Sequence, residues 1–150
     1  MDIRETLNEM LVNNFHKVQE LEKKALVTDE FSDISCNDMH IIEAIGLGND
    51  SKMGEVAKRL NITVGALTTS MNALVHKGYV ARCRSDHDRR VVNVYLLDKG
   101  KAAYRHHALF HERMVDNIMA ALDPEQLEIL AGTLETLMNY FESFADDEIL

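Results

Sequence analysis

The chain has 150 residues, of which 46% are hydrophobic and 27% charged, and its formal net charge is −9. These values fit one globular domain, and no apolar run approaches the ~20 residues that span a bilayer, which excludes a transmembrane helix. The polar start MDIRETLNEM does not resemble a signal peptide, and two cysteines cannot form a disulfide framework, so we expect a cytoplasmic protein without membrane association.

The charge is unevenly distributed along the chain. Residues 52–105 contain 11 lysines and arginines but only four acidic residues, whereas the remainder of the chain is strongly acidic. A basic segment on an acidic body indicates a surface that binds a polyanion, with nucleic acid as the first candidate.

The first predicted element is a long helix. Apolar residues recur at helical spacing over residues 7–25 and form one stripe, made of Leu7, Leu11, Phe15, Val18, Leu21 and Ala25. A second helix is expected after Ser35, because Ser35 and Asp38 have the spacing of a capping box. The glycines of GLGND are expected to end that helix.

Two short helices joined by a tight turn follow. Ser51 is expected to cap the first, and its inner face would carry Met53, Val56, Ala57 and Leu60. Thr63 is expected to cap the second, which would end at Gly78. Its inner face would carry Leu67, Met71, Leu74 and Val75.

A β-hairpin and two long helices complete the pattern. The segments YVARCR and RVVNVYLL flank a polar SDHD turn, and Val92, Val94 and Leu96 share one face of the second strand. Asp98 is expected to cap a helix that runs to about residue 121, and the pair Asp123-Pro124 predicts the start of another. The last helix has the apolar stripe Leu127, Leu130, Leu134, Leu137, Phe141 and Phe144.

The predicted order ααααββαα is mainly α with a small β-hairpin wing, in one domain over residues 1–150. Two short helices followed by a hairpin form a winged helix-turn-helix, which we assign to residues 35–97. The recognition helix would be residues 64–77. Small or polar residues face away from Leu67, as entry into a major groove requires, and they are Gly65, Thr69, Asn72 and His76, flanked by Thr63, Val64 and Thr68.

The hairpin gathers arginines around one short turn. Arg89 or Arg90 at its tip is expected to enter the adjacent minor groove, where the negative potential is strong. Asp86 and Asp88 are expected to hold the guanidinium groups in place. Phosphate contacts are expected from Lys77, Arg82 and Arg84.

Residues 55–100 resemble the MarR family of bacterial transcription regulators, most specifically through KGYVAR, DRRV and LDKG. The segments DISCNDMHIIEAIG and YRHHALFHERMVDNI resemble its FabT-like branch, which represses fatty-acid synthesis in Gram-positive bacteria. The departure is Asp98, where the wider family usually has threonine, but either residue can cap a helix. The resemblance implies a repressor without catalytic activity or cofactor.

The resemblance also implies a homodimer that binds a pseudo-palindromic DNA operator. The helices of residues 1–30 and 98–146, which are the first, fifth and sixth, would form the dimer interface. In the FabT-like branch, long acyl chains on acyl carrier protein would act as corepressor. The candidate lining of an acyl tunnel comprises Met39, Ile42, Ile45, Phe110, Met114 and Ile118, and candidate carrier-protein contacts are Arg105 and Arg113.

Other effectors remain open from the residues. His107 and His111 have the i, i+4 spacing that can chelate a metal, and His16, His40 and Glu20 or Glu43 could complete a zinc site. A small aromatic or phenolic ligand is a further alternative, and Cys83 between two arginines is a candidate redox sensor. Catalytic motifs such as a nucleophile elbow or a phosphate-binding glycine loop are absent from the sequence, so we expect no enzyme.

Overall fold

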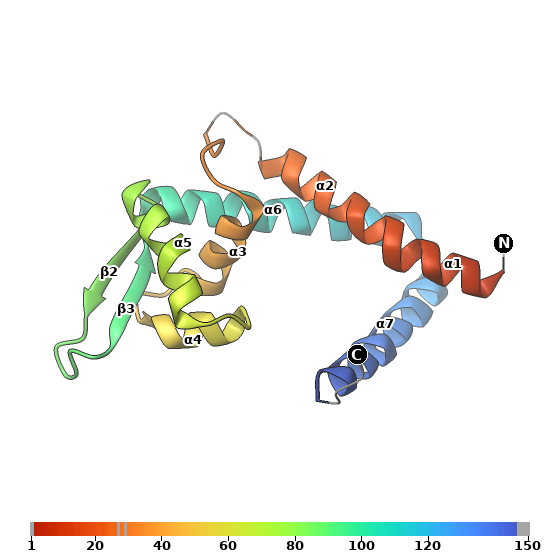
Figure 1. The fold of residues 1–150 in the computed structure, drawn as a ribbon. Coiled ribbons are helices and arrows are strands. Elements are labelled where there is room, and N and C mark those ends of the chain that lie inside the picture. Colours follow the sequence, from red (N-terminus) through yellow and green to blue (C-terminus); the bar gives the residue numbers. More distant parts are fainter. Residues whose placement is uncertain (1, 27, 29, 147–150) are drawn as a thin grey trace. The chain divides into compact units, whose positions relative to one another are not determined.

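The computed structural model describes residues 2–26, 28 and 30–146, and Figure 1 shows its ribbon. Two compact units meet in sequence at the boundary between Phe110 and His111. The secondary-structure elements are α1 (Ile3–Glu9), the π-helical turn η1 (Met10–Asn14), α2 (Phe15–Leu26), α3 (Cys36–Ile45), β1 (Ser51–Lys52), α4 (Met53–Arg59), α5 (Val64–His76), β2 (Val80–Arg84), β3 (Val92–Leu96), α6 (Asp98–Ala121) and α7 (Pro124–Asp146).

The predicted helix caps are largely confirmed. The Ser35 hydroxyl accepts a hydrogen bond from the Asp38 amide at 3.1 Å, and the Asp38 carboxylate accepts one from the Ser35 amide at 3.0 Å. Thr63 caps α5 by accepting from the Ala66 amide at 3.1 Å. Asp123 accepts from the Gln126 amide at 2.9 Å, which fixes the start of α7. These side chains satisfy amides that the first turn of a helix leaves without backbone partners.

Two predicted caps are wrong. Ser51 does not cap α4, because it lies in the short strand β1, and its buried hydroxyl donates to the Ile45 carbonyl at 2.8 Å. Lys52 precedes α4 instead and makes no capping hydrogen bond through its side chain. Asp98 is the first residue of α6 rather than the residue before it.

The sheet has three antiparallel strands in the order β1-β3-β2, one more strand than predicted. β1 pairs Ser51 with Val94, and β2 pairs Val80 with Leu96 and Arg84 with Val92. A two-residue strand is too short to carry an alternating pattern, so only tertiary pairing defines it.

The core of the first unit lies between α3, α4, α5 and the sheet. The predicted inner faces are confirmed: Leu67, Met71 and Leu74 of α5 are fully buried, and Val94 and Leu96 of β3 are buried with them. Glycine ends α5 as predicted, because Gly78 has φ +80° in the left-handed region.

The second unit comprises the end of α6, from His111 onward, and α7. Several large apolar side chains of α7 are exposed in this unit: Ile129, Leu134, Met138, Tyr140 and Phe141. Among the described residues, the helices are too short or too polar to cross a membrane.

Candidate nucleic-acid interface

The outer face of α5 is exposed, as its spacing predicts. Thr63, Val64, Gly65, Thr69, Asn72 and His76 are exposed, whereas Leu67, Met71 and Leu74 on the opposite face have no exposed surface. Val64 is 49% exposed although it is apolar. The helix therefore presents small, polar side chains and one apolar side chain, the residue types that read base edges in a major groove.

Thr68 lies at the border between the two faces of α5. It is half-buried, and its hydroxyl donates to the Val64 carbonyl at 2.7 Å. This bond occupies the hydroxyl hydrogen within the helix, so the group can only accept from another partner while the bond persists. Thr68 is therefore a predicted DNA contact whose hydroxyl hydrogen is already used in a hydrogen bond within α5.

The wing, which we define as β2, β3 and residues 85–91 between them, has an internally bonded turn. The Ser85 amide donates to the Val91 carbonyl at 2.9 Å, and the Val91 amide donates to the Asp88 carbonyl at 2.9 Å. Asp88 also accepts twice from the Arg90 guanidinium, at 3.2 Å for each oxygen. The Arg90 side chain, and then its backbone amide, hold the pKa of the Asp88 carboxyl below its ordinary value.

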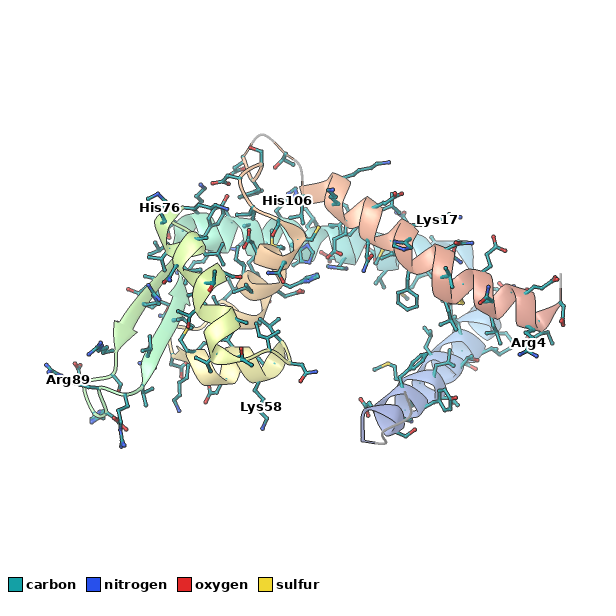
Figure 2. All side chains as sticks on the ribbon, viewed as in Figure 1. Arg4, Lys17, Lys58, His76, Arg89 and His106 are labelled. Carbon is teal, nitrogen blue, oxygen red and sulfur yellow. The ribbon has the colours of Figure 1, made fainter. Side chains whose placement is uncertain are left out.

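The arginines of the wing have distinct surroundings. Arg90 is bonded to Asp88, whereas Arg89 lies at the tip and is exposed (Figure 2). Arg82 and Arg84 are two positions apart in β2 and pair with Val94 and Val92, so both side chains lie on the sheet face that carries those valines. Both arginines are exposed.

A cavity of about 610 Å³ lies between α4, α5 and the wing. Its lining includes Val64 and Thr68 from α5, together with Arg82 and Arg90 from the wing. The recognition helix and the basic hairpin are thus neighbours, with cationic groups at one border of the cavity. Lys52 also lines the cavity, and its ammonium lies 3.5 Å from the Glu55 carboxylate in an ion pair. Helical spacing in the sequence did not indicate this basic residue, because Lys52 belongs to β1.

Lys77 is engaged by the protein itself. Its ammonium donates to the Asp33 carbonyl at 2.5 Å and lies 3.8 Å from an Asp38 carboxylate oxygen. Its contact with a DNA phosphate stays a prediction, and making that contact would require the ammonium to leave or share these partners.

The candidate acyl-binding residues fall into two environments. Met39 and Ile42 have no exposed surface and belong to the core beneath α5. Phe110 and Met114 on α6 are half-buried, and the Phe110 ring stacks on the His107 ring with centroids 6.5 Å apart. Their role in ligand binding stays a prediction.

A cluster of histidines and carboxylates lies between α2, α3 and α6. One carboxylate oxygen of Glu22 is 3.3 Å from Nε2 of His40 and 3.2 Å from Nε2 of His107. Glu43 is 3.7 Å from the same His107 nitrogen. Glu22 and His107 are 8% and 2% exposed, so this contact is buried.

The prediction that Glu20 is the acidic residue of α2 near these histidines is wrong. Glu22, rather than Glu20, reaches the histidines, because the helix turns Glu22 and Leu26 inward and leaves Leu21 53% exposed. His111 follows His107 by one turn of α6 and is half-buried, whereas His16 is exposed.

The two cysteines differ in exposure. Cys83 in β2 is exposed, and Cys36 at the start of α3 is half-buried. Burial, and then the negative charge of Glu22, raise the pKa of the Cys36 thiol. Cys36 is therefore the less reactive type of thiol, and its oxidation has no support from this geometry.

Comparison with known proteins gives concordant matches. A model of the MarR family matches residues 32–91. A crystal structure of Streptococcus pneumoniae FabT in complex with DNA is 37% identical, covers 94% of this chain and 99% of that chain, and has a TM-score of 0.89. The Bacillus subtilis regulator YpoP is 25% identical over 91 residues, which are 61% of this chain and 62% of YpoP. The Bacillus subtilis repressor YetL is 26% identical over 92 residues, or 61% of this chain and 55% of YetL.

The paired helices α4 and α5, the three-stranded sheet and the arginine-bearing hairpin define a winged helix-turn-helix protein. The alignments span about three fifths of the length of the first curated relatives. The chain belongs to the MarR family of transcription regulators.

Proposed function

We propose that this protein represses transcription by binding duplex DNA, with α5 in the major groove and the wing in the adjacent minor groove. The observation that carries the proposal is the pairing of an exposed, polar face of α5 with four exposed arginines on the neighbouring hairpin. Phosphate contacts would supply most of the affinity, and side chains of α5 would read base edges. The similarity to FabT, whose crystal structure is a complex with DNA, supports DNA binding by this chain.

A homodimer is the proposed form that binds DNA. The stripe of α1, η1 and α2 exposes large apolar side chains, with Leu7 at 46%, Phe15 at 59% and Leu21 at 53% exposed. Met138 of α7 is 62% exposed. Apolar helix faces of this extent usually mark an interface, and a two-fold dimer would present two winged lobes to a pseudo-palindromic operator.

Recognition of the operator is expected to depend on Asn72. Its amide can pair with the N6 and N7 edge of adenine, so Asn72→Ala should relax sequence preference at one position of each half-site by ~1–3 kcal/mol. The measurement is a binding profile over single-base variants of a duplex that the wild-type protein selects from a randomised pool. Asn117→Ala, at an exposed asparagine of α6, is the matched control and should leave the profile unchanged. A wild-type profile for Asn72→Ala would remove Asn72 from base recognition.

We further propose that the operators control fatty-acid synthesis and that acyl chains on acyl carrier protein strengthen DNA binding. The support is the 37% identity to FabT over nearly the whole chain, together with half-buried Phe110 and Met114 on α6. Long acyl chains need an apolar, adaptable lining, which methionine and phenylalanine supply. Arg105 and Arg113, both exposed on α6, are the proposed contacts for the acidic carrier protein.

A second candidate effector is a zinc ion held by Glu22 and His107, with His40 and His111 as candidates for a further ligand. Zinc–nitrogen and zinc–oxygen bonds of about 2.1 Å in a tetrahedron place neighbouring ligand atoms about 3.4 Å apart. The Glu22 oxygen is 3.2 Å from Nε2 of His107, which matches that spacing, and the same oxygen is 3.3 Å from Nε2 of His40. His111 is a candidate from its spacing to His107.

One experiment separates the two effectors. Affinity for the selected duplex is measured with carrier protein bearing a long acyl chain, with unacylated carrier protein, and with zinc. Tightening by the acylated form alone supports the fatty-acid proposal, whereas tightening by zinc alone supports the metal site. The controls for zinc are His40→Ala, whose side chain is 48% exposed, and His111→Ala, whose side chain is half-buried. A zinc response that survives when both histidines are replaced would contradict the metal site.

A further inference from the structure

Asp33 lies in the loop between α2 and α3 and bonds to three other segments of the first unit. Its carboxylate accepts a hydrogen bond from the Tyr79 hydroxyl at 2.5 Å and one from the Lys99 ammonium at 3.2 Å. Its backbone carbonyl accepts from the Lys77 ammonium at 2.5 Å. One residue outside the helix-turn-helix thus binds the residue that follows α5, the residue that precedes β2 and the first turn of α6.

The three partners also contact one another. Lys99 donates to the Lys77 carbonyl at 3.3 Å, and its ammonium lies 4.3 Å from the centre of the Tyr79 ring. Lys77 is the residue that ends α5, Tyr79 directly precedes β2, and Lys99 is in the first turn of α6. The cluster therefore closes around the point where the recognition helix passes into the wing.

This point of the fold has little freedom to move. The Tyr79 side chain is fully buried, its amide donates to the Leu74 carbonyl at 3.0 Å, and its carbonyl accepts from the Leu97 amide at 2.9 Å. Burial, and then the hydrogen bond to Asp33, raise the pKa of Tyr79, while the Tyr79 and Lys99 bonds lower the pKa of Asp33. At neutral pH the pair is thus a phenol donating to a carboxylate, which is the stronger type of hydrogen bond.

We propose that Asp33 is a positioning residue for DNA recognition: through Tyr79, Lys77 and Lys99 it sets the angle between the recognition helix and the wing. The inference rests on the proposed DNA binding and adds a residue that touches no DNA to the groups that determine operator affinity.

Electrostatics and positioning predict opposite signs for the loss of this charge. Removing an acidic side chain makes the protein less negative, which by itself favours binding to polyanionic DNA. Positioning predicts the reverse, because Asp33→Asn weakens the bonds to Tyr79 and Lys99 that hold the end of α5. Glu30→Gln removes the same charge three residues earlier in the same loop, at an exposed position, and is the matched control.

The test measures affinity of the full chain for a duplex selected by the wild-type protein and for a scrambled duplex of equal length. For Asp33→Asn we expect at least about threefold weaker binding to the selected duplex, with a smaller change on the scrambled one. Glu30→Gln should bind both duplexes as tightly as wild type or slightly more tightly. Tyr79→Phe should reproduce the Asp33→Asn loss, and the double variant should lose no more than either single variant.

Several results would overturn the inference. One is selective affinity of Asp33→Asn equal to that of Glu30→Gln, even if its melting temperature falls, because the residue would then only stabilise the fold. Another is a double variant whose losses multiply, which would show that Asp33 and Tyr79 act separately. If Asp33→Asn does not fold, Tyr79→Phe alone carries the test, and unchanged selectivity in that variant defeats the inference. Absence of any DNA binding by the wild type would defeat the proposed function, and the inference with it.

Discussion

Replacing Arg89 with alanine is expected to weaken binding to the selected duplex on the order of tenfold. Arg89 is exposed at the tip of the wing and lies outside the Asp88–Arg90 pair, so its guanidinium is available for the minor groove (Figure 2). The negative potential of a narrow minor groove favours an inserted arginine. The slope of log affinity against log salt concentration should also become shallower by about 1, the change expected when one ionic contact with DNA is lost.

The control for this prediction is Arg4→Ala, which removes the same charge from an exposed position on α1. Fluorescence anisotropy over a series of salt concentrations measures both variants, and thermal melting checks that each is folded. Equal affinity losses for Arg89→Ala and Arg4→Ala would mean that only net charge matters and that the wing makes no specific contact.

Gly100→Ala is expected to destabilise the fold by about 1–3 kcal/mol, the range for overpacked cores. A Cβ on Gly100 would lie 2.2 Å from the Tyr79 carbonyl oxygen and 3.3 Å from Cβ of Leu96, so α6 would have to move away from the start of β2. For a chain of this size, each kcal/mol corresponds to a fall of about 2–4 °C in melting temperature.

The same substitution at another glycine, Gly132→Ala, is expected to leave the stability of the fold unchanged or to raise it. Gly132 is in the interior of α7, and beyond its chain neighbours and the nearby helix backbone, a Cβ there would meet no atom of the described residues within 4 Å. Because alanine favours helix over glycine by about 0.5–1 kcal/mol, this variant should be as stable as wild type or more stable. Denaturant titration of both variants measures the difference. A Gly100→Ala protein as stable as Gly132→Ala would contradict the close contact between α6 and Tyr79.

Features set by neighbouring residues were predictable from the sequence. The caps at Ser35, Thr63 and Asp123 and the inner face of α5 depend on spacings of three or four residues, which a sequence displays directly. The exposed outer face of α5 followed from the same periodicity. The arginines of the wing were also visible, because they cluster within a single turn.

Features set by distant residues were not predictable. Asp33 meets Tyr79 across 46 positions and Lys99 across 66, and no local pattern relates these residues. Glu22 meets His40 across 18 positions, and the inward face of α2 differs from its apolar stripe because that stripe stays exposed in the single chain. The strand β1 exists only through pairing with β3. Such contacts depend on the completed fold rather than on periodicity.

The measurement that tests the account most directly is a chemical footprint of the wild-type protein and Arg89→Ala on the selected duplex. With the wild type, we expect protected purine N7 atoms in the major groove, flanked by protected sugars in the adjacent minor groove. This pattern should repeat in a second half-site about 10 base pairs, or a multiple of that spacing, away. Arg89→Ala should lose the minor-groove protection and keep the major-groove protection. Protection confined to the backbone with neither groove contacted, or an unchanged footprint in Arg89→Ala, would contradict the assignment of α5 and the wing as the DNA-binding surface.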